Sequence, residues 1–163
     1  MGPLFADSTS TFEALGDHQR AVLPRSSITQ LEGTPPADWR LLAHSNVLYT
    51  FSPNASVLVQ DGHFAMILMS PVAPDRTRID LLTVGRPIPE RERGEKVRAF
   101  LEANHAFTVR TLEEDFVLAE QIHRGLDCGA NETLRFARFE DALTAWHARL
   151  DARLAACIAH SRK

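Results

Sequence analysis

The strongest constraint on the fold is a two-residue link between two runs of strand-forming residues. The runs Ala55–Gln60 and 63–69 are rich in Val, Ile, Leu and Met, and only Asp61-Gly62 separates them. Asp-Gly between such runs favours a type I′ turn, in which both central residues have positive φ. The sequence therefore predicts a β-hairpin over residues 55–69.

Neighbouring segments extend this hairpin into an antiparallel sheet. Residues 46–51 end at Ser52-Pro53-Asn54, a turn that folds them back onto the next run, and residues 76–84 follow the turn-forming segment 71–75. We expect a meander of at least four strands. Upstream, the pattern over residues 9–23 is ambiguous, and residues 38–44 suggest a short helix.

The second half of the chain has the apolar spacing of helices. Beyond Pro87 and Pro89, helices are predicted over residues 90–104, 111–126 and 139–160. A β-rich part, 20–86, followed by a helical part, 89–160, is typical of an α+β fold, and 163 residues suit a single domain over 1–163. One face of the last helix is apolar, which predicts that it packs on the sheet; this face carries Phe139, Leu143, Trp146, Leu150, Leu154 and Cys157.

Charge and hydropathy exclude two classes of partner. The chain has 18 Lys and Arg against 21 Asp and Glu, with no basic cluster, so we expect no nucleic-acid binding. Its longest apolar run, 64–69, is far shorter than the roughly 20 residues of a membrane span. Without a secretory signal at the first residues, a cytoplasmic protein is expected. Cys128 and Cys157 are too few for a thiolate metal site, and we expect both to be buried as small apolar side chains.

One carboxylate stands out on the predicted helix 111–126. Asp115 falls on the apolar face of the helical wheel, between Ile122 and Leu126, and His123 shares that face. A carboxylate in an apolar setting needs a partner, so Asp115 either complements the helix N-terminus or serves as a metal ligand or catalytic group. His123 is eight residues away, about 12 Å along a helix, so the two cannot share one ion directly.

The other histidines show no metal-binding spacing. None stands in a His-x-His or Glu-x-x-His pair, and we expect each to be a surface residue or a hydrogen-bonded core residue. Phosphate-binding loops and nucleophile motifs are also absent from the sequence.

An ordered series of short motifs resembles a known family. Val47-Leu48-Tyr49-Thr50-Phe51-Ser52-Pro53-Asn54, then Gly62-His63, then Pro71-Val72-Ala73-Pro74-Asp75-Arg76-Thr77 is similar to the catalytic domain of Rieske non-haem iron ring-hydroxylating oxygenase α subunits. The second half continues the series with Glu114-Asp115, Arg124-Gly125-Leu126, Arg138-Phe139-Glu140 and Trp146-His147. In this chain Ser52 separates the Phe and Pro of the turn, and His123 stands where glutamine is usual.

The resemblance implies a fold and a metal ligand. The fold is a helix-grip (START-like) arrangement, an antiparallel sheet packed on a long C-terminal helix around an apolar substrate cavity. Asp115 corresponds to the carboxylate of the family's facial triad of two histidines and one carboxylate on mononuclear Fe(II).

Parts of the family's machinery are missing from this sequence. The resemblance places the motifs of the two-iron two-sulfur cluster, and the helix with both histidine ligands, upstream of this chain, so Asp115 would be one of three iron ligands. The chain thus resembles the C-terminal part of a catalytic domain. The complete form would hydroxylate a small, often aromatic, substrate and would work with an electron-transfer partner as a homo-oligomer.

Two alternatives remain open from the sequence. The chain could be a stand-alone helix-grip module that binds a small hydrophobic ligand without metal chemistry. Alternatively, apolar surface left by the missing segment could be covered by self-association.

Overall fold

The computed structural model describes residues 10–92, 94–129, 133, 135–138 and 140–161. The chain groups into two compact units, Met1–Ala119 and Glu120–Lys163, which are described separately below.

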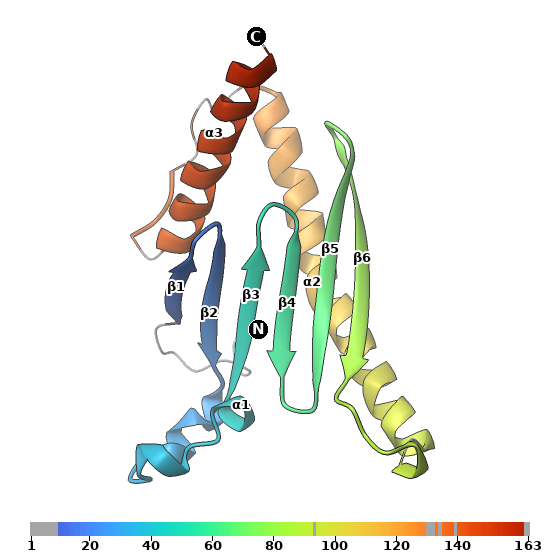
Figure 1. The fold of residues 1–163 in the computed structure, drawn as a ribbon. Helices are drawn as coiled ribbons and strands as arrows, with labels where there is room; N and C mark the ends of the chain where they lie inside the picture. Colours follow the sequence, from blue (N-terminus) through green and yellow to red (C-terminus); the bar gives the residue numbers. More distant parts are fainter. Residues whose placement is uncertain (1–9, 93, 130–132, 134, 139, 162–163) are drawn as a thin grey trace. The chain divides into compact units, whose positions relative to one another are not determined.

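The first unit is built on a six-stranded antiparallel meander (Figure 1). Each strand pairs with its neighbours in the sequence, and the connections are short turns except for the longer segment 25–44. The strands are β1 (Thr11–Leu15), β2 (His18–Pro24), β3 (Ser45–Phe51), β4 (Ala55–Gln60), β5 (His63–Ala73) and β6 (Arg76–Gly85). With the long helix α2 (Glu95–Asp127), this sheet confirms the α+β class and is consistent with the helix-grip fold.

The segment that was ambiguous in the sequence forms the first hairpin. β1 and β2 pair from Thr11↔Val22 to Leu15↔His18, and Gly16 at the turn has φ of +62°. Between β2 and β3 the chain makes 3₁₀ turns at Ser26–Leu31 and Pro36–Asp38 and the short helix α1 (Leu41–His44), close to the helix predicted over 38–44.

The central hairpin is confirmed, but its predicted turn type is wrong. Gln60 pairs directly with His63, so Asp61-Gly62 is a two-residue link as expected. Gly62 has φ of +88°, whereas Asp61 does not have positive φ. A type I′ turn requires positive φ at both positions, and here glycine alone adopts that conformation.

The helix α2 replaces two helices of the prediction. It runs without interruption through residues 104–111, where a break was expected. This stretch contains neither Pro nor Gly, and its polar side chains bond to the helix itself: Thr108 Oγ1 donates to Asn104 O at 2.9 Å, and Thr111 Oγ1 to Phe107 O at 3.0 Å. The helix therefore continues because this stretch holds no Pro or Gly, and the two hydroxyls find acceptors within it.

The first half of α2 packs on β5 and β6. Gly85 allows a close approach, since a Cβ built there would lie 3.2 Å from Leu101 Cδ1. Nearby, Thr83 Oγ1 and His105 Nδ1 share a hydrogen bond at 3.0 Å, and the His63 ring meets Phe100 edge-on at 5.5 Å. These contacts hold the helix across one face of the sheet (Figure 1).

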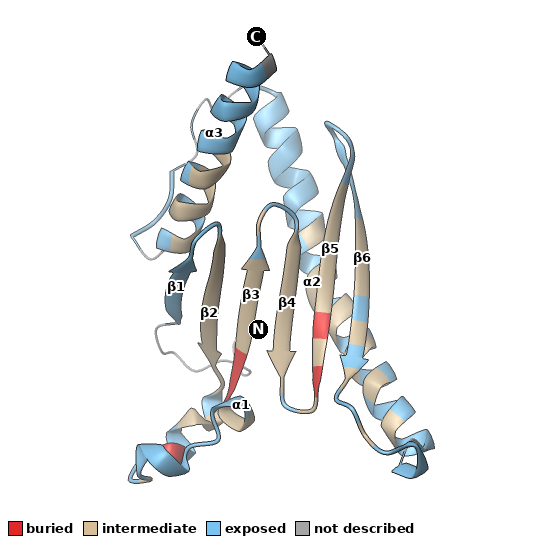
Figure 2. Cartoon of the chain, viewed as in Figure 1, coloured by how far each residue is buried: buried red, intermediate tan, exposed pale blue. Residues whose placement is uncertain are grey.

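Few of the described side chains are fully buried (Figure 2). Ala65, Ser45, Asn46 and His63 are buried in β3 and β5, and most of the remaining strand residues are half-buried. The sheet is therefore covered on its α2 side only in part, and large apolar side chains of α2 such as Val117 and Leu118 are exposed.

The second unit contains the end of α2 and the helix α3 (Asp141–Ser161). Phe139, which the prediction placed on the apolar face of the last helix, lies outside the described residues. Leu143 and Leu154 of that face are exposed, whereas Trp146 is half-buried and its ring meets that of His147 edge-on at 5.0 Å. The expected packing of this helix on the sheet stays a prediction.

The expectation that both cysteines are buried is wrong. Cys128 and Cys157 are exposed and form no disulfide. Cys128 follows the end of α2, where its Sγ donates a hydrogen bond to Gly125 O at 2.9 Å, and Cys157 lies on the exposed last turns of α3. None of the described helices is long and apolar enough to cross a bilayer.

The turn geometry predicts opposite effects for two Gly→Ala substitutions. At Gly62, φ of +88° is unfavourable for alanine, so Gly62→Ala should lower the free energy of unfolding by about 1 kcal/mol. Gly125 lies in α2 with open space at its Cβ position, so Gly125→Ala should raise it by about 0.5–1 kcal/mol. Urea unfolding followed by circular dichroism compares the two; equal effects of the two substitutions would contradict the turn assignment.

Candidate functional site

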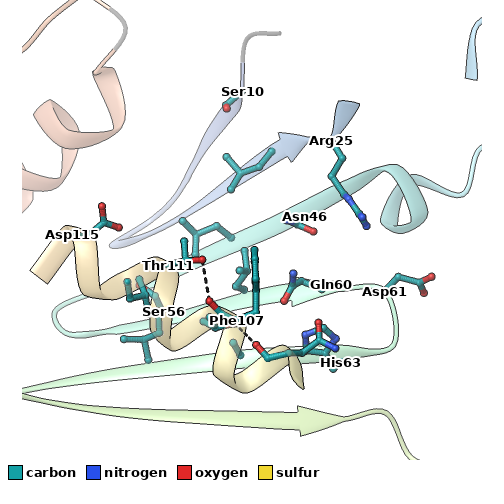
Figure 3. Close-up of a pocket in the computed structure, with 18 of the residues that line it drawn as sticks. Ser10, Arg25, Asn46, Ser56, Gln60, Asp61, His63, Phe107, Thr111 and Asp115 are labelled. Atoms are coloured by element: carbon teal, nitrogen blue, oxygen red, sulfur yellow. Dashed lines mark hydrogen bonds between the residues drawn. The ribbon is translucent and has the colours of Figure 1, made fainter. Parts of the chain in front are cut away.

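A cavity of about 820 Å³ lies between the sheet and the first half of α2. Its lining comes from residues 10–115, all within the first unit. The volume falls in the range of small-molecule sites. Nine of its 20 lining residues are apolar, and the others are polar or charged. α2 contributes Phe100, Asn104, Phe107, Thr108, Thr111, Leu112 and Asp115 (Figure 3).

The sheet side of the cavity is built from successive rows of paired residues. In one row Leu48 pairs with Leu58 and Leu58 with Ala65, and in the next Ser56 pairs with Ile67. Because side chains alternate between the two faces of a strand, every second residue of β3, β4 and β5 points into the cavity. The apolar runs that predicted β4 and β5 therefore also supply the apolar floor, through their inward residues Leu58, Ala65 and Ile67.

A polar row crosses the same floor at the end nearest the Asp61-Gly62 turn. Gln60 pairs with His63, and Asn46 lies one register step beyond the pair Val47↔Val59, which places it beside Gln60. All three line the cavity. Figure 3 shows their side chains grouped at one end of it, with Asp115 at the other.

Several atoms of this polar row are buried without a hydrogen-bond partner in the described part of the chain. They are Asn46 Oδ1, Gln60 Oε1 and both ring nitrogens of His63. Asn46 and His63 are only 7% and 6% exposed. Buried polar atoms normally have hydrogen-bond partners, so this row has hydrogen-bonding capacity that the described residues leave unused.

For His63 the structure corrects the expectation of a surface residue or a hydrogen-bonded core residue. The expectation holds for three other histidines: His18 Nδ1 accepts from Ser52 N at 3.2 Å, His44 Nδ1 and Ser27 Oγ are 3.3 Å apart, and His105 bonds to Thr83. The signal that was missed is the position of polar residues on the inward face of otherwise apolar strands. Recognising it required the strand register, which the sequence alone did not provide.

Asp115 lines the cavity, as the helical wheel suggested, but it is not buried. Its side chain lies at the cavity rim (Figure 3), and the residue is exposed. The argument that Asp115 needs a partner because its surroundings are apolar is therefore wrong, since solvent reaches the carboxylate. It also lies mid-helix, because α2 begins at Glu95, which removes the alternative of an N-terminal helix charge.

The described residues do not by themselves complete a metal site. No group of three or more His, Cys, Asp or Glu side chains with metal-binding geometry occurs among them. Asp115 offers one carboxylate, whereas Asp61, the other acidic residue of the lining, pairs with Arg86 at 3.1 Å. His123 belongs to the second unit and does not line the cavity. A facial triad on iron would need two further ligands.

Filling the cavity should abolish the binding of an apolar ligand. Thr111 points into the cavity from α2, so we expect Thr111→Trp to weaken naphthalene binding by about tenfold or more, because an overfilled site costs about 1–3 kcal/mol. The matched control is Arg110→Trp, on the exposed side of the same turn. Ligand-detected NMR measures both, and equal affinities for the two variants would place the ligand elsewhere.

Comparison with known proteins assigns the chain to a family. No curated protein and no solved structure gave a significant match. The family model described as the catalytic domain of the ring-hydroxylating α subunit matches residues 5–156, nearly the whole chain, including both the cavity and Asp115. The chain belongs to the family of ring-hydroxylating α subunit catalytic domains.

Proposed function

We propose that the chain is the substrate-binding, C-terminal part of a Rieske-type oxygenase catalytic domain that hydroxylates a small aromatic substrate. The observation that carries this proposal is the large cavity between the sheet and α2, in a chain that matches the family over residues 5–156. A flat apolar ring suits a floor built of Leu48, Leu58, Ala65 and Ile67.

Within this proposal, the sheet and α2 bind and orient the substrate. Rows of side chains from β3, β4 and β5 form the floor, while Phe107 and Thr111 of α2 face it (Figure 3). Removing water from both ring faces supplies the binding free energy, roughly 25 cal/mol for each Å² of apolar surface buried.

Asp115 is the carboxylate that this chain would contribute to a mononuclear Fe(II). Its support is its place at the cavity rim and its position in the Glu114-Asp115 motif. Bound iron supplies dioxygen activation, and hard oxygen ligands suit it. The described residues offer no complete ligand set for the ion, so Asp115 would hold it together with ligands from elsewhere.

Further parts of the proposal concern partners and location. The activity would require a two-iron two-sulfur cluster, which this chain does not carry, and an electron-transfer partner that supplies reducing equivalents. We propose a homo-oligomer, in which the cluster of one subunit can serve the iron site of another, a single domain over residues 1–163, and a cytoplasmic location.

A second candidate function is ligand binding without metal chemistry. It is favoured by the observation that the cavity and its buried polar row are complete within residues 10–115 of one unit. In this case Asp115 is a solvated side chain at the rim of the binding site.

Iron binding distinguishes the two candidates. In anaerobic equilibrium dialysis with Fe(II), we expect the 163-residue chain to bind iron weakly through Asp115, its one proposed ligand. Asp115→Ala should lose about tenfold or more of this affinity, since even the loss of an outer-shell group typically costs 10–100-fold.

The control for this experiment is Glu114→Ala, which removes the adjacent exposed carboxylate. It should bind iron as the unmodified chain does. Identical binding by all three proteins would contradict the role of Asp115 and favour the ligand-binding function.

A further inference from the structure

We propose that Asn46, Gln60 and His63 form a subsite for a hydroxyl group carried by an otherwise apolar ring ligand. The inference rests on the proposed function in one respect, that the ring occupies the cavity described above.

The first step is that these groups have no structural role that the described contacts explain. Asn46 Oδ1, Gln60 Oε1 and both nitrogens of His63 are buried without a partner among the described residues. His63 meets Phe100 only through a ring contact. Leaving a buried polar group unsatisfied costs about 1–3 kcal/mol. Because buried polar groups normally have partners, we infer that these atoms bond to a ligand group that enters the cavity.

The second step is that the three residues form one surface. Gln60 and His63 are direct partners across β4 and β5, and Asn46 adjoins Gln60 from β3. Their neighbours on the same face, Leu58 and Ala65, are apolar. A ligand that uses this row therefore needs one compact polar group and an apolar body.

The third step concerns the chemistry of that group. Two orphan amide oxygens accept hydrogen bonds, and a neutral imidazole offers one donor and one acceptor. A hydroxyl donates one hydrogen bond to an amide oxygen and accepts one from the imidazole N–H. A carboxylate fits worse, because its oxygens would face the two carbonyl oxygens.

The fourth step separates this subsite from Asp115. His63 contacts Phe100, and Asp115 lies 15 residues further along α2, roughly 22 Å at 1.5 Å per residue. Figure 3 shows the polar row and Asp115 at opposite ends of the cavity. A ligand held by its hydroxyl group would thus extend its ring along the helix towards Asp115.

The test compares three ligands of one ring system with the full chain. By isothermal titration calorimetry, we expect 2-naphthol to bind about tenfold more tightly than naphthalene, the gain from one or two hydrogen bonds to groups that are otherwise unsatisfied. 2-Naphthoate should bind more weakly than 2-naphthol. Tighter binding of 2-naphthoate than of 2-naphthol would overturn the proposal. It would indicate that Arg25, which also lines the cavity, binds the carboxylate.

The matched variant is the double substitution Asn46→Leu/Gln60→Leu, because either amide oxygen alone can accept the hydroxyl, and Gln121→Leu on the exposed surface of α2 is the control. The double variant should bind naphthol and naphthalene with affinities within about twofold of each other, and the control should keep the tenfold preference.

Thermal unfolding supplies a second readout that needs no ligand. Replacing an unsatisfied buried amide with an apolar side chain of similar size is close to neutral or stabilising, so the melting temperature of Gln60→Leu should not fall. A fall of about 3 °C or more, which corresponds to roughly 1 kcal/mol in a chain of this size, would show a structural role and overturn the proposal.

The outcomes also distinguish this inference from the proposed function. Equal binding of naphthalene and 2-naphthol by the unmodified chain overturns the hydroxyl subsite alone. Failure of both to bind overturns the subsite together with the proposed substrate cavity.

Discussion

The contact between the first half of α2 and strands β5 and β6 is the interaction on which the site depends. Gly85 brings Leu101 close to the sheet, and the hydrogen bond between Thr83 and His105 fixes the helix along it. A Cβ at this point would lie 3.2 Å from Leu101 Cδ1, so the Leu101 side chain would have to shift. A missing Cβ and one side-chain hydrogen bond therefore mark where α2 lies against the sheet beside the cavity.

The cavity combines two kinds of surface with different physical consequences. Its floor of Leu48, Leu58 and Ala65 favours any apolar ring, because burial of apolar surface is non-directional. The buried row of Asn46, Gln60 and His63 is directional, and its unsatisfied atoms destabilise the empty protein. Sites of function are where proteins commonly tolerate such a cost. We thus expect the apolar floor to supply most of the affinity for a ligand, and the polar row to discriminate between ligands.

Much of the fold was predictable, because it follows from local chemistry. Two runs of strand-forming residues and the Asp61-Gly62 link predicted the central hairpin, and the change of period after Pro87 and Pro89 predicted the helical half. The expected break in α2 was wrong because residues 104–111 contain no Pro or Gly to end the helix, and the type I′ turn was wrong because Asp61 does not have positive φ.

The sequence by itself determined the family, the order of a β-rich part before a helical part, and the identity of Asp115 as a carboxylate on the cavity side of a helix, since these depend on residue type and spacing. Only the tertiary structure decided burial. It placed Asp115 at an exposed rim, exposed both cysteines, and aligned Asn46, Gln60 and His63 across three strands to form a buried row. The physical reason is that burial and partnership depend on the register between strands and on the position of α2 over them, and neither is encoded in any one segment.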